Sequence, residues 1–507
     1  MVLLLKAKAE TSKHREPIII YGAGHGGFQL ANALQGSKYK VAGFVDDNPR
    51  IRGTIMRGLK VSNPKKLPRL VKTFGVKHIL LALGNAPRSK RSSIIKQLEA
   101  LEISVKTIPD MNDILAGKSK IEDIRDVDVE DLLGRDQVMP VPMLLSACIT
   151  NKNVFVSGAG GSIGSELCRQ ILKQSPTRLV LFELNEYNLY KAEAELTEII
   201  ASHGYQIELV SILGSAQNKS QLKRVFESYN INTIYHAAAY KHVPLIEKNI
   251  IEGVKNNVLG TWFCALAAID ANVDSFVLIS TDKAVRPSNV MGASKRLAEL
   301  SLQALAENQK VTRFTMVRFG NVLGSSGSVV PLFRKQIHNG GPVTVTHPEI
   351  TRYFMTIPEA AELVLQAGSI GTGGDVFVLD MGQPVKIVDL AKRMIQLSGL
   401  SLKDESNENG DIEVKFSGLR PGEKLFEELL IGKNVTSTSH PRILRAEEKH
   451  LKYSEIKIIL EDLEKSCRQQ KRSEVELLLL KAPLDYKSPS TNTSNIVQYS
   501  DAKVQLR

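Results

Sequence analysis

Two short apolar runs in this chain each end in a cluster of glycines and then give way to a helical pattern. The first run, residues 18–21, precedes GAGHGG at residues 22–27, and the second, residues 153–157, precedes GAGGSIG at residues 158–164. A strand that turns through glycines into a helix is the opening unit of a parallel βαβ sheet. The chain is therefore predicted to be α/β, with two Rossmann-like doubly wound parallel-sheet domains.

The spacing of further apolar runs sets the extent of these domains. After the first glycine cluster, runs at 41–45 and 79–83 predict an N-terminal nucleotide-binding-type domain over residues 14–136. The second domain, residues 151–485, is expected to carry strands at 153–157, 179–182, 207–212, 233–238, 275–280 and 313–319. Six strands alternating with helices are typical of a dinucleotide-binding catalytic domain.

The remaining segments are predicted from their composition. Residues 1–13 and 486–507 are polar and are expected to be disordered tails, and residues 137–150, with two prolines, form a linker. From about residue 320 the alternation weakens into a region rich in Gly and Pro, which is expected to form a small substrate lobe. Ser454 is expected to cap a helix that runs to about Cys467, before a second helix at about 472–481.

Composition excludes several classes of protein. The 507 residues are 43% apolar, enough for two or three cores, and the net charge of +12 is spread among acids without a basic run, so no nucleic-acid partner is expected. No apolar segment reaches the length of a membrane span. The cysteines are too far apart to form a metal-ligand spacing, which predicts a reduced, cytoplasmic protein without a metal site; they are Cys148, Cys168, Cys264 and Cys467.

The second glycine cluster is the candidate cofactor site. Its backbone N–H groups can approach a pyrophosphate at the start of a helix, and the residues involved are Gly158, Gly160, Gly161, Ser162, Ile163 and Gly164. Glu183 ends the next strand, about 20 residues further on, where a carboxylate accepts hydrogen bonds from a ribose and repels a 2′-phosphate. NAD is therefore predicted in preference to NADP. The first cluster, with Asp46 at the next strand end, fits either a nucleotide ligand or a purely structural turn.

A candidate chemical site follows the fifth strand of the second domain. Thr281, Asp282 and Lys283 stand at the carboxyl end of a central strand, where doubly wound sheets place their chemistry. Neighbouring residues of a strand point to opposite sides, so these three must leave strand geometry to converge. Met291 and Lys295 are four residues apart and face the same side of one helix, where the lysine would hold the nicotinamide ribose.

Six ordered motifs carry a resemblance to a known family. They are the segment 157–166, HAAAYKHVP at 236–244, ISTDKA at 279–284, MGASK at 291–295, VRFGNVLG at 317–324 and GLRPGEK at 418–424. Over residues 14–450 the chain resembles the bacterial polysaccharide-biosynthesis nucleotide-sugar 4,6-dehydratases, of the extended short-chain dehydrogenase superfamily. It lacks the N-terminal transmembrane helices of the large members. It also has Met291 where the superfamily has a tyrosine, which resembles the large, C5-retaining UDP-N-acetylglucosamine 4,6-dehydratases.

The resemblance implies a reaction and roles for residues. The sugar is oxidised at C4 by bound NAD, loses water across C5 and C6, and takes the hydride back at C6. Thr281 would bond the C4 hydroxyl, Asp282 would protonate the leaving hydroxyl, and Lys283, its pKa lowered by neighbouring cations, would remove the C5 proton. Ala237 and Ala238 would lie against the cofactor. A UDP-N-acetylhexosamine would be held by Lys241, His242, Asn321, Arg318, Arg352 and Arg420.

Other functions remain open at this stage. A UDP-N-acetylhexosamine 4-epimerase also borrows and returns a hydride, although Met291 cannot replace the tyrosine it uses. A non-catalytic nucleotide-sugar or NAD-binding regulator would explain two Rossmann-like domains. We expect a cytoplasmic homo-oligomer that makes a product for bacterial surface polysaccharide, and peripheral attachment to the inner membrane stays an alternative.

Overall fold

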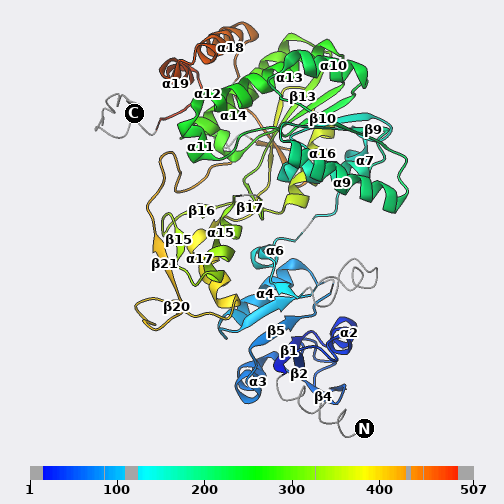
Figure 1. Ribbon diagram of the computed structural model, residues 1–507, viewed down its shortest axis with the longest axis vertical. Coiled ribbons are helices and arrows are strands. Elements are labelled where there is room, and N and C mark those ends of the chain that lie inside the picture. The colour runs from blue at the N-terminus through cyan, green and yellow to red at the C-terminus, as the bar shows by residue number, and fades with distance from the viewer. Residues whose placement is uncertain are drawn as a thin grey trace, which may run out of the picture. The chain divides into compact units, whose positions relative to one another are not determined.

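The computed structural model describes residues 15–84, 86–108, 124–136, 138–325, 327–429, 435–448 and 450–488. They form two compact units, which confirms the predicted α/β class with parallel, Rossmann-like sheets (Figure 1). Unit 1 is drawn from residues 1–137, 326–350 and 385–418, and unit 2 from residues 138–325, 351–384 and 419–507. The predicted tail at 1–13 lies outside the described residues. Of the tail predicted at 486–507, residues 486–488 are described, and Tyr486 is buried.

Unit 1 is built on a sheet whose described strands follow the order β3-β4-β2-β1-β5-β6-β7. Its first strand is central and covered on both faces of the sheet, so the consecutive apolar residues Ile18, Ile19 and Ile20 are all buried. The elements before the linker are β1 Glu16–Tyr21, α2 His25–Ala33, β2 Tyr39–Val45, β3 Ile55–Met56, β4 Leu59–Ser62, η1 Pro64–Lys66, α3 Leu67–Phe74, β5 His78–Leu81, α4 Arg88–Glu99, β6 Ser104–Thr107, β7 Arg125–Asp126 and α6 Val129–Leu133.

Two later segments of the chain complete unit 1. Their elements are α15 Val329–His338, β15 Val343–Val345, β19 Val385–Lys386, α17 Ile387–Leu397, β20 Leu402–Lys403 and β21 Ile412–Phe416. In α17, the Arg393 Nε atom lies 2.6 Å from Glu99 Oε1 of α4, and Arg393 also donates to the Leu132 carbonyl. The sequence placed these segments in a lobe of the catalytic domain. The contacts instead join them to the N-terminal domain, through these Arg393 bonds and a bridge between Ser398 and Ser104 of β6.

Unit 2 contains a larger sheet in the order β10-β9-β8-β11-β12-β13-β18-β23-β22. Its elements are α7 Pro142–Ser146, β8 Asn153–Ser157, α8 Ser162–Leu172, β9 Arg178–Glu183, α9 Glu186–His203, β10 Glu208–Leu213, α10 Lys219–Ser228, β11 Thr233–His236, α11 Val243–Lys248, α12 Ile250–Val254, the π-helical η2 Lys255–Leu259, α13 Gly260–Asp270, β12 Ser275–Ile279, the 3₁₀ turn η3 Asp282–Ala284, α14 Val290–Asn308, β13 Arg313–Arg318, β14 Asn321–Val322, β16 Thr351–Arg352, β17 Phe354–Met355, α16 Ile357–Ile370, β18 Asp375–Leu379, β22 Val435–Ser437, β23 Ile443–Ala446, α18 Tyr453–Arg468 and α19 Arg472–Lys481.

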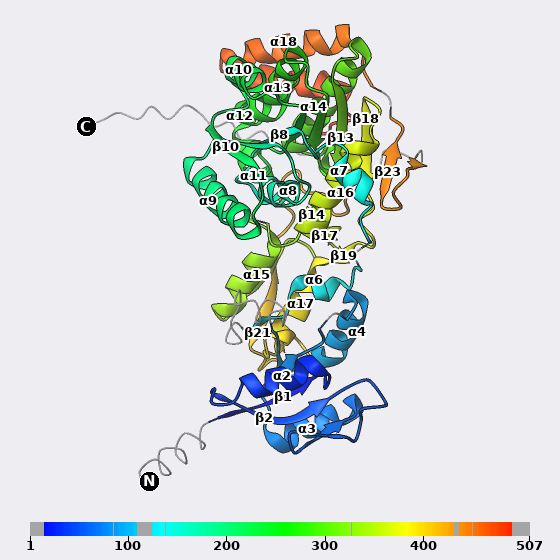
Figure 2. The same cartoon turned by 90° about the vertical axis from the view of Figure 1, so that its right-hand side faces the viewer.

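Helices cover both faces of this sheet (Figures 1 and 2). The helices α10, α13 and α14 pack on one face, and α8, α9 and α16 pack on the other. The strands β8 to β13 follow the doubly wound order, in which β8, the first of them along the chain, lies at the centre. Such a sheet brings the ends of β8, β11 and β12 to one edge, so the glycine turn and the chemical site lie at the same edge.

The C-terminal helices α18 and α19 pack against α14, which is buried over residues 290–305. Their positions match the helices predicted from the sequence, but the predicted cap is wrong. The helix begins at Tyr453, and Ser454 lies inside its first turn. Glu455 instead accepts a hydrogen bond from the backbone N–H of Lys452, because a glutamate three residues after the cap can reach back to it.

None of the helices in the described part of the chain is both long and apolar enough to cross a membrane.

Candidate active site

The Thr-Asp-Lys segment leaves strand geometry directly after β12, as the sequence predicted. Residues 282–284 form a 3₁₀ turn, and the backbone N–H of Asp282 donates to the carbonyl of Phe319. The Thr281 hydroxyl accepts a hydrogen bond from the Lys283 backbone N–H at 3.3 Å and donates to Asp282 Oδ1 at 2.9 Å. This turn lets three consecutive side chains meet, which a strand would not allow.

The ammonium of Lys283 lies among three side-chain oxygens. Its Nζ atom is 3.0 Å from Asp282 Oδ1, 3.2 Å from Asn321 Oδ1 and 3.4 Å from Glu427 Oε1. The side chains of Asp282 and Glu427 are 1% and 3% exposed, so both carboxylates are shielded from water. Of the residues that the structure describes, none donates a hydrogen bond to Asp282 Oδ2 or Glu427 Oε2. We call Asp282, Lys283, Asn321 and Glu427 the lysine cluster.

The charge around Lys283 differs from the sequence expectation. Burial alone would lower the pKa of this lysine, but the negative charges of Asp282 and Glu427 outweigh it and raise the pKa above its ordinary value. The expectation that cations would lower the pKa of Lys283 is therefore wrong for this arrangement. The cation Arg352 acts in that direction, and its effect is smaller than that of either carboxylate.

Met291 and Lys295 lie four residues apart on helix α14, which is buried over residues 290–305. Both side chains are buried, and burial lowers the pKa of Lys295 to about 8. Between them, a Cβ on Gly292 would lie 2.2 Å from the carbonyl oxygen of Lys283. A glycine is therefore required for the helix to approach the Thr-Asp-Lys turn this closely, which explains the glycine in the MGASK motif.

The glycine turn after β8 packs tightly on its surroundings. A Cβ on Gly158 would lie 2.8 Å from the backbone nitrogen of Ala238, and one on Gly164 would lie 2.0 Å from the Gly158 carbonyl oxygen. The turn therefore lies against the backbone of Ala237 and Ala238 that follows β11. Helix α8 starts at Ser162 with Gly161 exposed at its N-terminus, so free N–H groups of its first turn remain available to an anion.

Glu183 braces this glycine turn. Its carboxylate accepts hydrogen bonds from the backbone N–H of Gly160 at 3.0 Å and of Leu184 and Asn185 at 2.9 and 3.0 Å. These bonds hold the carboxylate at the end of β9, beside the glycines. A carboxylate has about four acceptor positions, so the bonds leave capacity for a ribose hydroxyl.

A buried asparagine that the sequence did not single out positions the loop after β11. Asn257, in the π-helical segment η2, accepts from the backbone N–H of Tyr240 and donates to its carbonyl, at 2.8 and 2.9 Å. It also donates to Ser294 of α14 at 3.1 Å. Lys241 and His242 follow on this loop and are exposed. A π-bulge with such an asparagine often marks a functional site, but sequence alone does not reveal the bulge.

The three predicted substrate arginines lie in different environments. Arg318 is fully buried, and its guanidinium binds both oxygens of Glu299 and of Glu448. It stabilises the interior and cannot reach a ligand, so its predicted role in substrate binding is corrected. Arg352 is also buried, at 3.3 Å from Glu423 and 3.8 Å from Glu427. The exposed Arg420 alone remains open to a solvent-borne anion.

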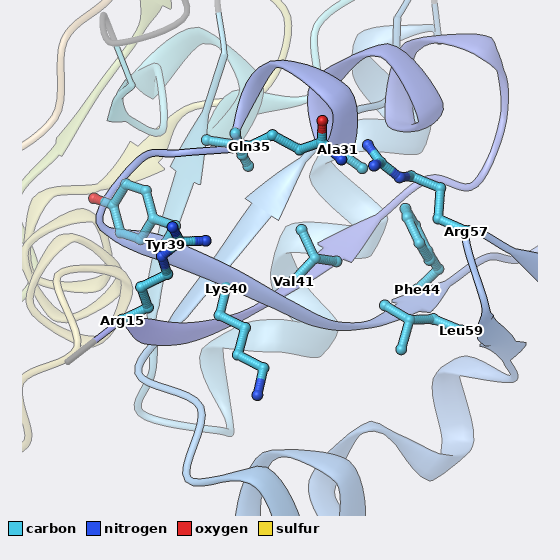
Figure 3. A pocket seen from close by; sticks show the side chains of 10 residues that line it. Arg15, Ala31, Gln35, Tyr39, Lys40, Val41, Phe44, Arg57 and Leu59 are labelled. Carbon is cyan, nitrogen blue, oxygen red and sulfur yellow. The ribbon is translucent and has the colours of Figure 1, made fainter. Parts of the chain in front are cut away.

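Unit 1 repeats the glycine turn but holds its pocket elsewhere. The Ala23 backbone N–H donates to Asp46 Oδ2 at 2.7 Å, and a Cβ on Gly27 would lie 2.0 Å from the Gly22 carbonyl oxygen. A pocket of about 190 Å³ lies at the opposite, C-terminal end of α2 (Figure 3). It is lined by Arg15, Ala31, Leu34, Gln35, Tyr39, Lys40, Val41, Phe44, Arg57 and Leu59. This pocket is not a site formed by the glycine turn.

Comparison with known proteins places this geometry in a family. The family model described as polysaccharide biosynthesis protein matches residues 154–448. The chain is 44% identical to the capsular polysaccharide biosynthesis protein CapD of Staphylococcus aureus, over 91% of this chain and 76% of that protein. It is 43% identical to the probable polysaccharide biosynthesis protein EpsC of Bacillus subtilis, over 81% of this chain and 68% of that protein.

A solved structure agrees with this relationship. The structure of Pen from Bacillus thuringiensis is 31% identical, with a TM-score of 0.52, and the match covers 62% of this chain and 98% of that chain. The family model spans the glycine turn, the Thr-Asp-Lys turn and the lysine cluster. The chain therefore belongs to the polysaccharide biosynthesis protein family of CapD and EpsC type, a family of nucleotide-sugar dehydratases and epimerases in the short-chain dehydrogenase superfamily.

Proposed function

We propose that this protein is an NAD-dependent UDP-N-acetylglucosamine 4,6-dehydratase that retains the configuration at C5. The observation that carries the proposal is the lysine cluster, in which a buried acid and a lysine lie 3.0 Å apart at the carboxyl end of a central strand. An elimination needs an acid and a base on one substrate, whereas a 4-epimerase needs only the hydride exchange and one group for the C4 oxygen. Met291 stands where a tyrosine would serve that oxygen.

The glycine turn of unit 2 fits a dinucleotide. Gly158 and Gly164 leave no room for a Cβ, the exposed Gly161 precedes the first turn of α8, and Glu183 lies at the end of β9. Lys295, buried on α14, would hold the nicotinamide ribose. Bound NAD would supply the hydride acceptor for C4 and the hydride donor for C6.

Thr281 and Asp282 form a route for the C4 hydroxyl proton. The Thr281 hydroxyl already donates its proton to Asp282 Oδ1. Toward the sugar it can therefore act only as a hydrogen-bond acceptor, with the C4 hydroxyl as the donor. When the C4 hydroxyl loses its proton to Thr281 Oγ1, the threonine passes its own proton to Asp282. The protonated Asp282 can then protonate the C6 hydroxyl that leaves as water, so the same aspartate serves both steps.

Lys283 would act on C5. A ketone at C4 acidifies the C5 proton, and a neutral lysine amine can remove it. The resulting ammonium returns a proton to C5 when the hydride reaches C6, so the lysine ends the cycle as it began. In the resting arrangement three side-chain oxygens lie within 3.4 Å of the Lys283 ammonium, and two nearby carboxylates raise its pKa, so the lysine must first lose a proton.

The substrate would reach this cluster from the exposed loops of unit 2. Lys241 after β11 and Arg420 are exposed cations, which suits a diphosphate. Burial and the charge of Lys241 lower the pKa of the neighbouring His242, so this side chain would bind the substrate as a neutral imidazole. Asn321 accepts a hydrogen bond from Lys283, so its side chain would lie beside a sugar bound at the lysine cluster. The product would be UDP-2-acetamido-2,6-dideoxy-D-xylo-hexos-4-ulose, an intermediate for bacterial surface polysaccharide.

Purified protein incubated with UDP-N-acetylglucosamine tests the proposal. A dehydratase yields a sugar that has lost one water, with a 4-keto group and a 6-methyl group visible by NMR. Formation of UDP-N-acetylgalactosamine would establish an epimerase instead. An unchanged sugar, with NAD bound, would favour a non-catalytic regulator.

A further inference from the structure

The segment that begins at the last glycine of the GLRPG motif lies across the catalytic loop as a strap. We define the strap as residues 422–428. The carbonyl of Gly422 accepts hydrogen bonds from Ser288 Oγ at 2.8 Å and from Asn289 Nδ2 at 3.0 Å. Lys424 Nζ donates to the carbonyl of Val285 at 2.9 Å. The strap therefore follows the loop that joins the Thr-Asp-Lys turn to α14.

Charged residues at the end of the strap complete these contacts. Glu428 pairs with Arg286 at the surface, while Glu427 turns inward to Lys283 at 3.4 Å. The Arg352 Nε atom lies 3.8 Å from the same Glu427 oxygen. A buried carboxylate is unfavourable without partners, and Lys283 and Arg352 are the cations that accompany Glu427.

The two carboxylates on Lys283 are not equivalent. Oδ1 of Asp282 already accepts the Thr281 hydroxyl, and in the proposed reaction Asp282 takes up the proton of the C4 hydroxyl. It cannot hold a second proton at the same time. In the described part of the chain, Asp282 Oδ2 and Glu427 Oε2 alike have no hydrogen-bond partner, so the two carboxylates differ in the Thr281 hydroxyl, which donates to Asp282. Glu427 is therefore the carboxylate that stays free to accept a proton from Lys283.

We propose that Glu427 takes the proton of Lys283 and holds it while the lysine acts on C5. An N–H bond of the ammonium breaks and an O–H bond forms on Glu427, which replaces an ion pair by two neutral groups. Lys283 then removes the C5 proton, returns a proton to C5, and recovers its original proton from Glu427. The proton count of the cluster is unchanged, and Glu427 acts as a positioning residue through Lys283. This inference rests on the proposed dehydratase reaction.

Glu427→Gln is the test, with Glu428→Gln as the matched control on the same strap. The amide keeps the size of the side chain but cannot accept a proton. We expect kcat of Glu427→Gln to fall about 100-fold near neutral pH, with KM changed less than about threefold, and to recover as pH rises and solvent removes the lysine proton. Glu427→Asp should restore part of the rate, and Glu428→Gln should match the unsubstituted protein.

A second readout needs no turnover. Competitive acetylation followed by peptide mass spectrometry measures the titration of Lys283 in the protein without substrate. Removing the negative charge of Glu427 should shift that titration to lower pH in Glu427→Gln and leave it in place in Glu428→Gln.

The outcomes separate the inference from the proposed function. An unshifted Lys283 titration in Glu427→Gln would overturn the pairing, whatever the reaction. A shifted titration with an unchanged or faster rate at neutral pH would show that Glu427 only holds the charge of Lys283 and would overturn its role as proton acceptor. If the unsubstituted protein leaves the sugar unchanged, the dehydratase function fails and this role fails with it, even where the titration shifts.

Discussion

The two glycine turns of this protein are built alike but end in different chemistry. In each, a glycine of the following helix leaves no room for a Cβ, which would lie 2.0 Å from the carbonyl oxygen of the first glycine. In each, an acid at the next strand end accepts a backbone N–H of the turn, Asp46 from Ala23 and Glu183 from Gly160. The shared parts are those that pack a helix on a parallel sheet.

The strands beside the two turns also end alike, and the chemical groups stand one strand further on. β5, beside β1, is followed by Ala82, and β11, beside β8, is followed by Ala237 and Ala238. A Cβ on Gly22 would lie 2.4 Å from the Ala82 carbonyl oxygen, and one on Gly158 would lie 2.8 Å from the Ala238 nitrogen. In unit 2 the next strand, β12, runs into Asp282 and Lys283. A glycine turn alone therefore indicates the fold, and the side chains at the end of β12 indicate the reaction.

The largest effect should come from removing the lysine of unit 2. Lys283→Ala should reduce turnover of UDP-N-acetylglucosamine by at least about 1000-fold, because no other amine lies in the described lysine cluster, while bound NAD is retained. Lys72→Ala, at an exposed position of α3 in unit 1, is the control and should leave turnover unchanged. Turnover assays with the NAD content of each purified variant provide the measurement. Normal turnover of Lys283→Ala would remove this lysine from the mechanism.

The next largest contrast should come from replacing one glycine in each turn by alanine and comparing the loss of stability. A Cβ on Gly160 would lie 2.5 Å from the Asn188 Cβ, whereas one on Gly24 would meet no atom within 4 Å. Gly160→Ala should destabilise unit 2 by about 1–3 kcal/mol and lower its NAD content. Gly24→Ala should cost less than about 1 kcal/mol. Denaturant unfolding and cofactor analysis test both, and equal losses in the two variants would contradict the distinction.

The strand-end acids offer a smaller contrast. Glu183→Gln loses one of the two carboxylate oxygens that accept backbone N–H groups, so NAD affinity should fall about 10-fold and discrimination against NADP should weaken. Asp46→Asn should destabilise unit 1 by about 1 kcal/mol without any change in NAD affinity. Titration of both variants with each cofactor measures the effect. A loss of NAD affinity in Asp46→Asn would assign the cofactor to unit 1.

The smallest predicted effect is on stability at low pH, where acid should change the free energy of unfolding of the two units in opposite directions. Burial would raise the pKa of Glu299 in unit 2, but Arg318 and Arg296 lower it to about 2. Its stabilisation is present above the unfolded pKa of about 4.5 and is lost as pH falls through the folded pKa. In unit 1, burial raises the pKa of Glu130 and Asp131, so their contribution is present at low pH and is lost as pH rises.

Hydrogen exchange from about pH 5 to about pH 3 measures this contrast, after correction for the intrinsic pH dependence of exchange. Protection should fall in α14 of unit 2 and hold or rise in α4 and α6 of unit 1. Parallel loss in both units would contradict the assignment of these carboxylates.

Much of the fold follows from local pattern, and much of the site does not. Short apolar runs that end in a glycine cluster predict β1 and β8, because a strand that turns through glycines into a helix opens a parallel βαβ unit. The assignment of α17 to unit 1 depends on a long-range contact between Arg393 and Glu99, which periodicity does not encode. The buried partners of Arg318 are likewise distant in sequence, so a strand-end arginine resembles a ligand until Glu299 and Glu448 are placed.

Glu427 was missed for a similar reason. The GLRPGEK motif drew attention to Arg420, seven residues before Glu427, and acids near a surface loop are common. Only its burial and the distance of 3.4 Å to Lys283 distinguish Glu427 from the exposed pairing of Glu428. By contrast, Asp282 and Lys283 could be predicted because the end of a central parallel strand has a known place in such sheets.

Conversion of UDP-N-acetylglucosamine in deuterated water tests the central claim most directly. If Lys283 removes and returns the C5 proton, NMR should show one deuterium at C5 of the 4-keto-6-deoxy product, with the configuration at C5 retained. A substrate with deuterium in place of the hydrogen on C4 should give, in ordinary water, a product that carries this deuterium on C6 of the same molecule. A product without deuterium at C5, or with inverted C5, would contradict the roles assigned to the lysine cluster.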